Sequence, residues 1–470
     1  MLSLSFLITL FLIFFIILAF ARLDLALLFT IFALPAYLIR FKIYSLPLTL
    51  LETMILISFG VWFLKSFLPH LKKIIKNRQN IIPYPFGVEI ILLLIIAFVS
   101  AGVSGFSLSS LGIFKAYFFE PVLLFILIIN VFKTRRDSLK ILSTLLCSAV
   151  LISLIALYQK ITGQFIFNNF WAEAETRRVV SLFGYPNAIG LYLAPLIMVF
   201  IGWLFYLPKR TLLNGAFKKI AIIITIIISF LAIYFAHSRG ALIGLGLAIL
   251  VFILMAANKK RKPILITLGI IALLVLVIPA SRNYIQNKLQ FKDLSSEIRR
   301  QQWKETLLML TDGRIISGAG LDNYQAAVKP YHQEGLFFNS DNLPNFSQQL
   351  RASATLRAKY WQPVEIYMYP HNIFLNFWSE LGLFGLLLFI WIVIKYFFIA
   401  LRLTIIYSRE NKPEKYLMIG LLCAMVAIII HGLVDVPYFK NDLAAMFFIY
   451  LALLGSFNLQ EKYDGIKIDK

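Results

Sequence analysis

Residues 219–262, KIAIIITIIISFLAIYFAHSRGALIGLGLAILVFILMAANKKRK, consist of two apolar runs joined by three residues and followed by a basic cluster. The runs, 219–236 and 240–257, are each close to the roughly 20 residues that a helix needs to cross a bilayer. The connection HSR allows only a tight turn, and the cluster KKRK is typical of a cytoplasmic helix end. This stretch therefore predicts two antiparallel membrane helices whose basic end lies in the cytoplasm.

The composition of the whole chain agrees with a membrane protein. Of its 470 residues, 60% are hydrophobic and 14% are charged, and the mean hydropathy is +0.82. A soluble globular chain is about 45–50% apolar and about 25% charged. The formal net charge of +22 comes mostly from short clusters between apolar runs, as in cytoplasmic anchors. We therefore expect a lipid bilayer around the chain and no nucleic-acid partner.

Thirteen apolar runs follow one another along the chain. They are 4–20, 24–39, 47–68, 87–104, 112–132, 141–161, 188–207, 219–236, 240–257, 264–281, 373–400, 416–433 and 443–457. The basic clusters between them are 72–78, 133–140, 209–219, 259–262 and 402–415. Because two runs separate each cluster from the next, all the clusters are expected in the cytoplasm. Arg40 and Lys42 would then lie outside, which favours an early run that does not cross.

The sequence thus predicts an all-α integral membrane protein with about 12 (12–13) transmembrane helices and one long extracytoplasmic loop. Residues 1–281 would form the N-terminal transmembrane helices and residues 282–370 the large periplasmic or extracellular loop. Residues 371–470 would form the C-terminal transmembrane helices and a short cytoplasmic tail. A loop of more than about 12–15 residues is usually functional or disordered, and the aromatic residues of this loop argue against disorder.

Short helices are expected within the loop. Apolar spacing predicts one over 297–310, with an apolar face that comprises Ile298, Trp303, Leu307 and Leu310. The stretch GAGLDNY (318–324) is rich enough in glycine to cradle an anion, although a lone Gly-x-Gly is more often a turn.

Four ionisable residues near the predicted outer ends of the membrane helices are candidates for a site. They are Arg178, Arg239, Arg299 and His371. Each has an ordinary explanation when it is considered alone, since an arginine can reach to the interface and a histidine can cap a helix. The predicted topology nevertheless places all four residues on one side of the membrane. Ionisable groups near the depth of the bilayer cost free energy and are therefore candidates for a functional role. A joint role is therefore the stronger hypothesis.

These residue types together indicate phosphate chemistry. Arginine forks match phosphate oxygens in pairs, and a helix N-terminus such as the one expected after His371 adds partial positive charge. A histidine near neutrality accepts a proton from a hydroxyl. No group of residues has the spacing of a metal site. We expect metal-free group transfer with a diphosphate leaving group, and no cofactor.

Five stretches of the chain resemble the O-antigen ligase family, which also includes O-antigen polymerases and protein O-oligosaccharyltransferases. They are RVVSLFGYPNAIGLYL (178–193), HSRGALIGLGLAIL (237–250), EIRRQQWKETLLMLTDGRIISGAGLDNY (297–324), PHNIFLNFWSELGLFGLLLF (370–389) and HGLVDVPYFKNDLA (431–444). The third and fourth are the most specific. The resemblance implies about twelve helices with one large periplasmic loop. It also implies transfer of a glycan from undecaprenyl diphosphate to an acceptor without metal or nucleotide.

The resemblance also assigns residues. The family's arginine after a short outer turn falls on Arg239, its loop arginine on Arg299 and its histidine on His371. The family often has a hydrophobic residue and a proline before the Gly-x-Gly, whereas this chain has GRIISGAG with Arg314.

The resulting hypothesis is a multi-pass glycosyltransferase of the cytoplasmic (inner) membrane, with its active site facing the periplasm or the extracellular side. Arg239, Arg299 and Arg178 would bind the diphosphate of an undecaprenyl-diphosphate-linked glycan donor. His371 would be catalytic and would activate the hydroxyl of a glycolipid, glycan or protein acceptor, such as lipid A-core in O-antigen ligation.

Three alternatives stay open. A repeat-unit polymerase or a protein O-oligosaccharyltransferase would use the same mechanism with another acceptor. A polysaccharide transporter or flippase would show inverted repeats and broken helices near the midplane, and the sequence shows neither. A structural membrane protein would not need arginines and a histidine gathered on one side.

Overall fold

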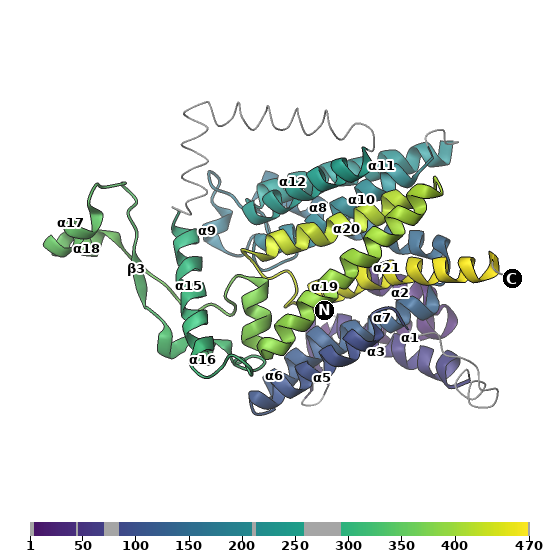
Figure 1. The fold of residues 1–470 in the computed structure, drawn as a ribbon, viewed down its shortest axis with the longest axis horizontal. Coiled ribbons are helices and arrows are strands. Elements are labelled where there is room, and N and C mark those ends of the chain that lie inside the picture. Colours follow the sequence, from purple (N-terminus) through teal and green to yellow (C-terminus); the bar gives the residue numbers. More distant parts are fainter. Residues whose placement is uncertain (1–3, 44–45, 70–83, 209–212, 258–292, 469–470) are drawn as a thin grey trace.

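The computed structural model describes residues 4–43, 46–69, 84–208, 213–257 and 293–468, which form mostly helices (Figure 1). The N-terminal part contains α1 (Leu4–Ala21), α2 (Leu23–Phe32), η1 (Leu34–Leu38), β1 (Arg40–Ile43), β2 (Leu46–Thr49), α3 (Leu50–Trp62), η2 (Phe63–Phe67), α5 (Gly87–Val103), α6 (Leu108–Phe114), η3 (Lys115–Phe119), α7 (Glu120–Val131), α8 (Arg135–Thr162), α9 (Asn169–Ala172), α10 (Asn187–Tyr206), α11 (Leu213–Phe235) and α12 (Arg239–Ala256). The remainder contains α15 (Leu294–Thr311), α16 (Tyr324–Val328), η5 (Lys329–Tyr331), β3 (Gly335–Phe337), α17 (Phe346–Ala352), α18 (Ala354–Tyr360), β4 (Trp361–Pro363), α19 (Ile373–Arg409), α20 (Glu414–Gly432) and α21 (Asn441–Ile468).

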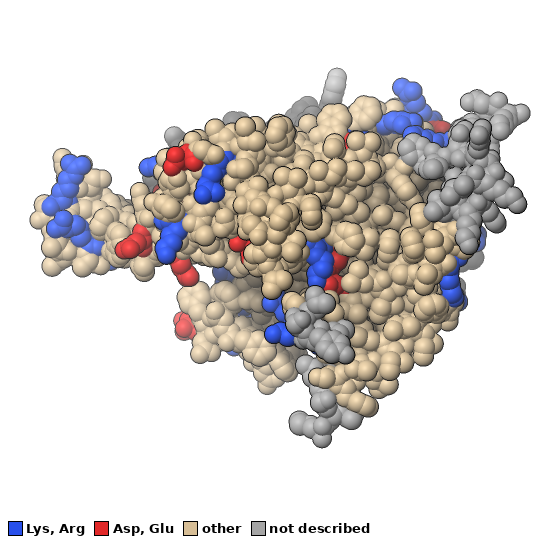
Figure 2. Space-filling model, turned by 90° about the horizontal axis from the view of Figure 1, so that it is seen from below, with Lys and Arg blue, Asp and Glu red and all other residues tan. Residues whose placement is uncertain are grey.

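The predicted all-α integral membrane class is confirmed. Within the described residues, nine helices are long and apolar enough to cross a membrane, and three shorter apolar helices accompany them. Much of the bundle surface in Figure 2 lacks charged side chains, as lipid contact requires. The count of twelve stays a prediction, because the run at 264–281 lies outside the described residues.

One early apolar helix is too short to cross the membrane, as the positions of Arg40 and Lys42 led us to expect. Helix α2 has 10 residues, about 15 Å of helix, which is half the thickness of a bilayer core. An antiparallel hairpin of β1 and β2, which the sequence did not predict, then pairs Arg40 with Thr49. Thr49 caps α3 through a capping box with Glu52, so a polar turn separates these two helices.

Helices α10, α12 and α20 pack with their backbones close together because glycines lie at their contacts. A Cβ atom on Gly202 of α10 would lie 2.8 Å from the Cα atom of Gly420 in α20. A Cβ atom on Gly240 of α12 would lie 2.7 Å from the His431 ring of α20. Small residues allow this approach between membrane helices. The packing brings the start of α10, the start of α12 and the end of α20 to one end of the bundle.

Helix α19 is broken near its start, at Gly382. The backbone there has φ 72° and ψ −176°, a region open essentially to glycine alone. A Cβ atom on Gly382 would lie 2.0 Å from the Ile316 carbonyl oxygen. The Leu383 N–H, freed by the break, donates to that same oxygen at 3.2 Å.

The Gly-rich loop fills this break. The Ala319 N–H donates to the Ser379 carbonyl oxygen at 2.6 Å, and a Cβ atom on Gly318, whose φ is 67°, would lie 2.5 Å from the same oxygen. The Ser100 hydroxyl of α5 donates to the Glu380 carbonyl oxygen. The stretch 318–320 therefore binds the protein's own backbone, and the anion-binding alternative for it is wrong.

The predicted loop contains short helices, as expected, and a projecting arm, which we define as residues 332–363. The arm comprises β3, α17, α18 and β4, and Figure 1 shows it extending beyond one end of the bundle. We call this end the arm end. Strands β3 and β4 pair in antiparallel fashion.

The apolar face predicted for 297–310 is confirmed only in part, because Leu310 is buried and Ile298 and Trp303 are half-buried, whereas Leu307 is exposed. The side chains of α15 that are buried are Gln302, Glu305, Thr306, Met309 and Leu310. Glu305 accepts the Gln333 N–H at 2.9 Å and lies 3.2 Å from the His332 ring, and Thr306 pairs with the Tyr324 hydroxyl at 2.8 Å. Polar residues are buried here because the loop returns onto this face and supplies their partners.

Candidate active site

Asp435 lies at the centre of the polar groups at the arm end, in the turn between α20 and α21. It is buried. Its Oδ1 accepts the Val436 N–H at 2.9 Å, and its Oδ2 accepts the Asn187 side-chain amide at 3.0 Å. Two histidines face it from other elements, with His371 Nδ1 at 3.8 Å from Oδ1 and His431 Nε2 at 3.9 Å from Oδ2.

Asp435 is held as a carboxylate. Burial alone would raise its pKa, but His371, His431 and the Val436 N–H together hold that pKa well below its usual range. An ionised carboxylate beside a histidine ring favours a proton on the ring nitrogen that faces it. The second ring nitrogen is then free to accept a proton.

His371 is placed by strained backbone at the start of α19. Its φ of 47° lies in the left-handed region, which a non-glycine residue rarely adopts outside special sites. Asn372 holds the position, because its side-chain amide donates to the Leu433 carbonyl oxygen at 3.1 Å. The Tyr367 ring packs edge-on against the imidazole at 5.3 Å. Among the described residues, no hydrogen-bond partner reaches the buried Nδ1 atom of His371, so its 3.8 Å approach to Asp435 is the contact that orients it.

Arg178 links the arginines to this carboxylate. Its Nε donates to the Ala236 carbonyl oxygen at 3.1 Å, and its Nη2 donates to the Asn187 side-chain oxygen at 3.3 Å. Burial lowers the pKa of Arg178, and the positive charges of Arg239 and Arg299 lower it further. Three guanidinium groups therefore act on one another at the arm end, which would attract an anion of high charge.

Arg239 is the most exposed of the three. It begins α12, its side chain is 67% exposed, and its Nη1 lies 3.2 Å from Asp293 Oδ2 at the start of α15. An exposed pair of this kind contributes little to stability, so an incoming phosphate could replace Asp293. Partial burial lowers the pKa of His237, and so do Arg178, Lys160 and Arg239, which marks the same cationic region.

Two helices begin at this end of the bundle without a side-chain cap. They are α12, which follows Ser238, and α10, which follows Pro186. At the start of α19, in contrast, the Asn372 side chain accepts the Phe374 and Leu375 N–H groups, both at 3.0 Å. The Asn372 cap thus occupies two of the N–H groups that were expected to face the diphosphate at α19. The uncapped start of α12 adds partial positive charge beside Arg239.

Arg299 reaches the site from α15. Its Nε is buried and has no hydrogen-bond partner among the described residues, which is costly without a ligand. Burial and the Glu365 charge raise the pKa of Tyr367, and Arg299 opposes them. The two neighbouring arginines make contacts within the protein instead. Arg177 donates to the Lys160 carbonyl oxygen at 2.9 Å. Arg300 pairs with Glu297 at 3.4 Å.

The structure thus gathers all four residues chosen from the sequence at one end of the bundle, and it adds others that the sequence analysis missed. The additions are Asp435, Asn187, His431 and Tyr367. One signal was available, because HGLVD places an acid four residues after a histidine, next to a membrane run. Asn187 and Tyr367 carried no such signal.

Residues 224–390 match the sequence profile of the family described as O-Antigen ligase. The matched range contains Arg239, Arg299 and His371, whereas Arg178 and Asp435 lie outside it. None of the curated proteins matches the chain.

Proposed function

We propose that the protein is a membrane glycosyltransferase, because residues 224–390 match the O-Antigen ligase profile and the described residues include nine helices long and apolar enough to cross a membrane. It transfers a glycan from undecaprenyl diphosphate to an acceptor hydroxyl outside the cytoplasm, without a metal ion. One observation carries this proposal: Asp435 faces His371 and is joined through Asn187 to Arg178. A proton acceptor and an anion site are thereby fixed in one network.

The chemistry follows from these two parts. The acceptor oxygen attacks the anomeric carbon of the donor, and the bond from that carbon to the diphosphate oxygen breaks. The acceptor proton passes to Nε2 of His371, and Asp435 stabilises the imidazolium that forms. The diphosphate leaves with the bonding electron pair, and its charge is met by Arg178, Arg239 and Arg299. No step requires a metal.

The arm end faces away from the cytoplasm in this proposal. The basic clusters 133–140 and 402–415 lie at the other end, where Arg135 Nη1 and Glu414 Oε1 approach to 2.8 Å. The positive-inside rule assigns that end to the cytoplasm. The site would then open to the periplasm or to the extracellular side of the inner membrane.

Helix α19 is broken. Broken helices are a feature of transporters that the sequence did not show. The break lies at Gly382, about ten residues from the start of a helix of 37 residues, and the protein's own loop fills it. Broken helices of transporters instead meet near the midplane and hold the substrate. The geometry at Gly382 therefore favours an enzyme.

One assay tests the proposal and separates the acceptor classes. Purified protein is mixed with a polyprenyl-diphosphate-linked glycan and with lipid A-core, a free repeat-unit glycan or a protein acceptor, in the presence of EDTA. Transfer of one glycan to lipid A-core indicates a ligase, a ladder of products a polymerase, and a modified protein an oligosaccharyltransferase. Absence of transfer to every acceptor, or transfer only after magnesium is added, would contradict the proposal.

A further inference from the structure

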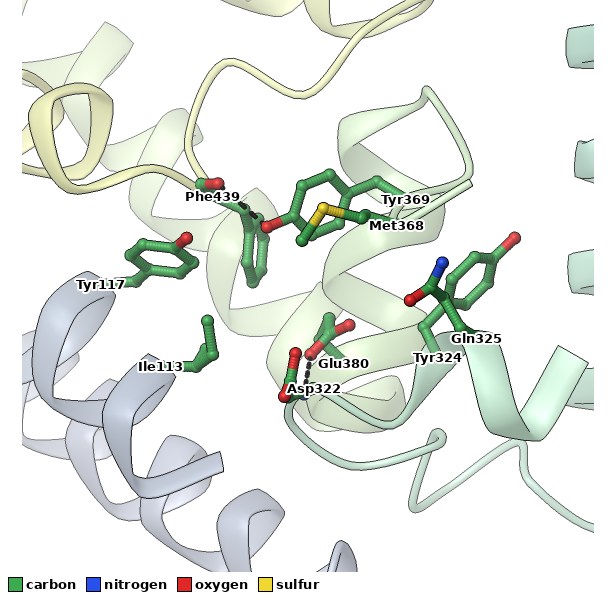
Figure 3. Close-up of a pocket in the computed structure, with 9 residues that line it drawn as sticks. All are labelled: Ile113, Tyr117, Asp322, Tyr324, Gln325, Met368, Tyr369, Glu380 and Phe439. Atoms are coloured by element: carbon green, nitrogen blue, oxygen red, sulfur yellow. Dashed lines mark hydrogen bonds between the residues drawn. The ribbon is translucent and has the colours of Figure 1, made fainter. Parts of the chain in front are cut away.

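One pocket at the arm end is nearly filled by the protein's own groups. Figure 3 shows this pocket, which lies between η3, α19 and the turn before α21. The Asp322 N–H donates to Glu380 Oε2 at 2.9 Å, and the Tyr369 hydroxyl donates to the Phe439 carbonyl oxygen at 3.2 Å. The space that remains is about 20 Å³, which is room for about one water molecule. The pocket therefore belongs to the packing of α19, whereas the surface of the same end carries exposed apolar side chains.

The loop between α8 and α10 begins with ten residues that carry no charge, GQFIFNNFWA (163–172). We call these ten residues the aromatic loop. They include the short helix α9, which Figure 1 shows at the arm end. Phe165, Phe167 and Phe170 are exposed, and the exposed fraction of Phe167 reaches 94%. Apolar side chains in water cost free energy, so a group of them on one surface indicates a contact with a partner.

The backbone of the aromatic loop leaves these rings on its outer side. Phe165 has a φ of 61°, a left-handed conformation that costs free energy in a residue other than glycine. Ile166 is buried, and the Gln159 side-chain amide of α8 donates to the Phe165 carbonyl oxygen at 3.0 Å. The inner side of the loop is thus fixed to the bundle, while Phe165 and Phe167 stay exposed on either side of Ile166.

The exposed rings continue a lipid-facing stripe on α8. The stripe consists of exposed apolar side chains three or four positions apart, which share one face of a helix. They are Leu151, Leu154, Tyr158 and Ile161. The Tyr158 and Phe165 ring centroids are 6.1 Å apart. The apolar surface of the helix therefore passes directly into the aromatic loop.

The length of α8 places the aromatic loop at the membrane surface. The helix has 28 residues, and its basic residues Arg135, Arg136 and Lys140 lie near its start. The roughly 20 residues from Lys140 to Lys160 span about 30 Å, the thickness of a hydrocarbon core. Ile161 and the aromatic loop then lie between the hydrocarbon and the headgroups at the arm end, the depth at which interfacial segments bury aromatic side chains.

The far end of the aromatic loop holds the segment that contains Arg178. The Arg178 N–H donates to the Trp171 carbonyl oxygen at 3.0 Å. The Arg177 Nε donates to the Ala172 carbonyl oxygen at 3.2 Å. The depth of the loop in the membrane therefore affects the depth of Arg178.

We propose that the aromatic loop is a membrane-contact element, which inserts Phe165, Phe167 and Phe170 into the bilayer leaflet at the arm end. The partner of this surface is the hydrocarbon of the surrounding lipids, because the loop continues the lipid-facing stripe of α8 and carries no charge. One consequence rests on the proposed function. The inserted loop holds Arg178 at the depth of the lipid phosphates, where the diphosphate of a lipid-linked donor also lies.

Fluorescence quenching in proteoliposomes measures the insertion without turnover. Phe167→Cys, in a chain whose Cys147 and Cys423 are replaced by serine, is labelled with the fluorophore NBD. Lipids with a doxyl group near the headgroup should quench this label more strongly than lipids with a doxyl group near the chain end, and aqueous iodide should quench it weakly. Leu154→Cys, about 10 Å deeper along α8, should show the opposite lipid preference. Ser340→Cys in the arm is the control in water and should be quenched by iodide alone.

Two results would overturn the membrane contact. One is iodide quenching of the Phe167→Cys label as strong as that of the Ser340→Cys label. The other is a Phe167→Cys label protected from both iodide and doxyl lipids, because another part of the protein, a second copy or a partner protein would then cover the loop.

Transfer kinetics in proteoliposomes measure the consequence for the donor. Phe167→Ser should raise the KM of the lipid-linked donor about three- to tenfold and leave kcat unchanged, since one aromatic side chain no longer holds the loop at its depth. Phe337→Ser is the matched control, because Phe337 is an exposed phenylalanine of the arm, and it should leave the donor KM unchanged. An unchanged donor KM in Phe167→Ser despite quenching by doxyl lipids would overturn the positioning of Arg178. Absence of transfer by the wild type would reject the proposed function and its consequence for Arg178, while the quenching result would stand.

Discussion

At the scale of single residues, two charged or titratable side chains of the candidate site have buried nitrogen atoms without a hydrogen-bond partner among the described residues. Arg299 keeps a buried Nε without a partner, and His371 keeps a buried Nδ1 without a hydrogen bond, within the described residues. Such groups cost free energy in a protein that only needs to fold. They are explained if substrate supplies the missing contacts, since catalytic hydrogen bonds are often long before substrate binds and shorten afterwards.

The first prediction concerns His371 as general base. His371→Gln should insert and fold normally, bind the lipid-linked donor and lose turnover by about 10²–10⁴-fold, because glutamine cannot take the proton. The measurement is the initial rate of glycan transfer, with donor binding measured in parallel. Recovery of most of the activity in the glutamine variant would limit His371 to orienting the acceptor.

The second prediction concerns Asp435 as a positioning residue. Its lowered folded-state pKa means that its stabilising contribution is present above the ordinary carboxyl range and is lost only as pH falls through the lower, folded value. Protonation of Asp435 itself therefore does not explain a loss of turnover between about pH 7 and pH 5. Asp435→Asn should reduce turnover less than His371→Gln does, about 10- to 100-fold.

The pH profile distinguishes this role from simple packing. Removing the negative charge favours the neutral imidazole, so the acidic limb of the Asp435→Asn profile should move to lower pH. A variant that loses activity by unfolding would keep the limb where the wild type has it.

A third prediction concerns the guanidinium fork of Arg299. Arg299→Lys keeps the charge and loses the paired hydrogen bonds, which are worth about 1.5–3 kcal/mol, so kcat/KM for the donor should fall roughly 10- to 100-fold. Arg300→Lys is the control, since Arg300 is the next residue on the same helix and pairs with Glu297. Equal effects of the two substitutions would show that only net charge matters at this end.

At the scale of elements, the broken α19 and the loop that fills it are one unit. The Ser379 and Glu380 carbonyl oxygens accept from Ala319 and Ser100, and Asp322 donates from the same loop to the Glu380 side chain. Backbone groups at membrane depth need such partners, because lipid supplies none. The unit fixes the start of α19, and with it His371, relative to the loop that carries Arg299.

The fourth prediction tests this unit at Gly382. Gly382→Ala would place a Cβ atom 2.0 Å from the Ile316 carbonyl oxygen at a φ of 72°, so it should destabilise the protein by at least about 1–3 kcal/mol. Gly246→Ala in α12 is the control, because a Cβ atom there meets nothing within 4 Å, and alanine favours a helix over glycine. Thermal unfolding in detergent measures both, and equal melting temperatures would contradict the strain at Gly382.

At the scale of the whole molecule, the polar groups are divided between the two ends. The arm extends beyond one end of the bundle (Figure 1), where the arginines, His371 and Asp435 also lie, and the described basic clusters lie at the other end. Glu89 on α5 pairs with Lys395 of α19 at 2.6 Å towards this second end. The proposed enzyme would need this division, because its lipid-linked donor would be used on one side of the membrane only.

The fifth prediction concerns orientation. In a chain whose Cys147 and Cys423 are replaced by serine, a cysteine at Ser340 in the arm should react with an impermeant thiol reagent in intact spheroplasts. A cysteine at Glu410 should react only after lysis, because basic clusters stay in the cytoplasm. The reverse pattern of labelling would invert the proposed topology.

The sequence by itself determined the membrane class and most of the helices. Each apolar run of about 20 residues is favoured in lipid on its own, since a helix satisfies its backbone within the run. It also determined that Arg178, Arg239, Arg299 and His371 belong to one side, because basic clusters orient the runs between them.

Only the tertiary structure decided the parts that depend on distant partners. The break at Gly382 is stable because Ile316 lies against it, and Asp435 orients His371 from a turn more than sixty positions away in the sequence. The buried face of α15 is polar because the returning loop supplies Glu305 with donors. Hydrophobic periodicity reports burial in lipid or core, residue by residue. Periodicity does not indicate which distant residue forms the hydrogen bond or ion pair of a buried polar atom. Those long-range contacts are what form the site.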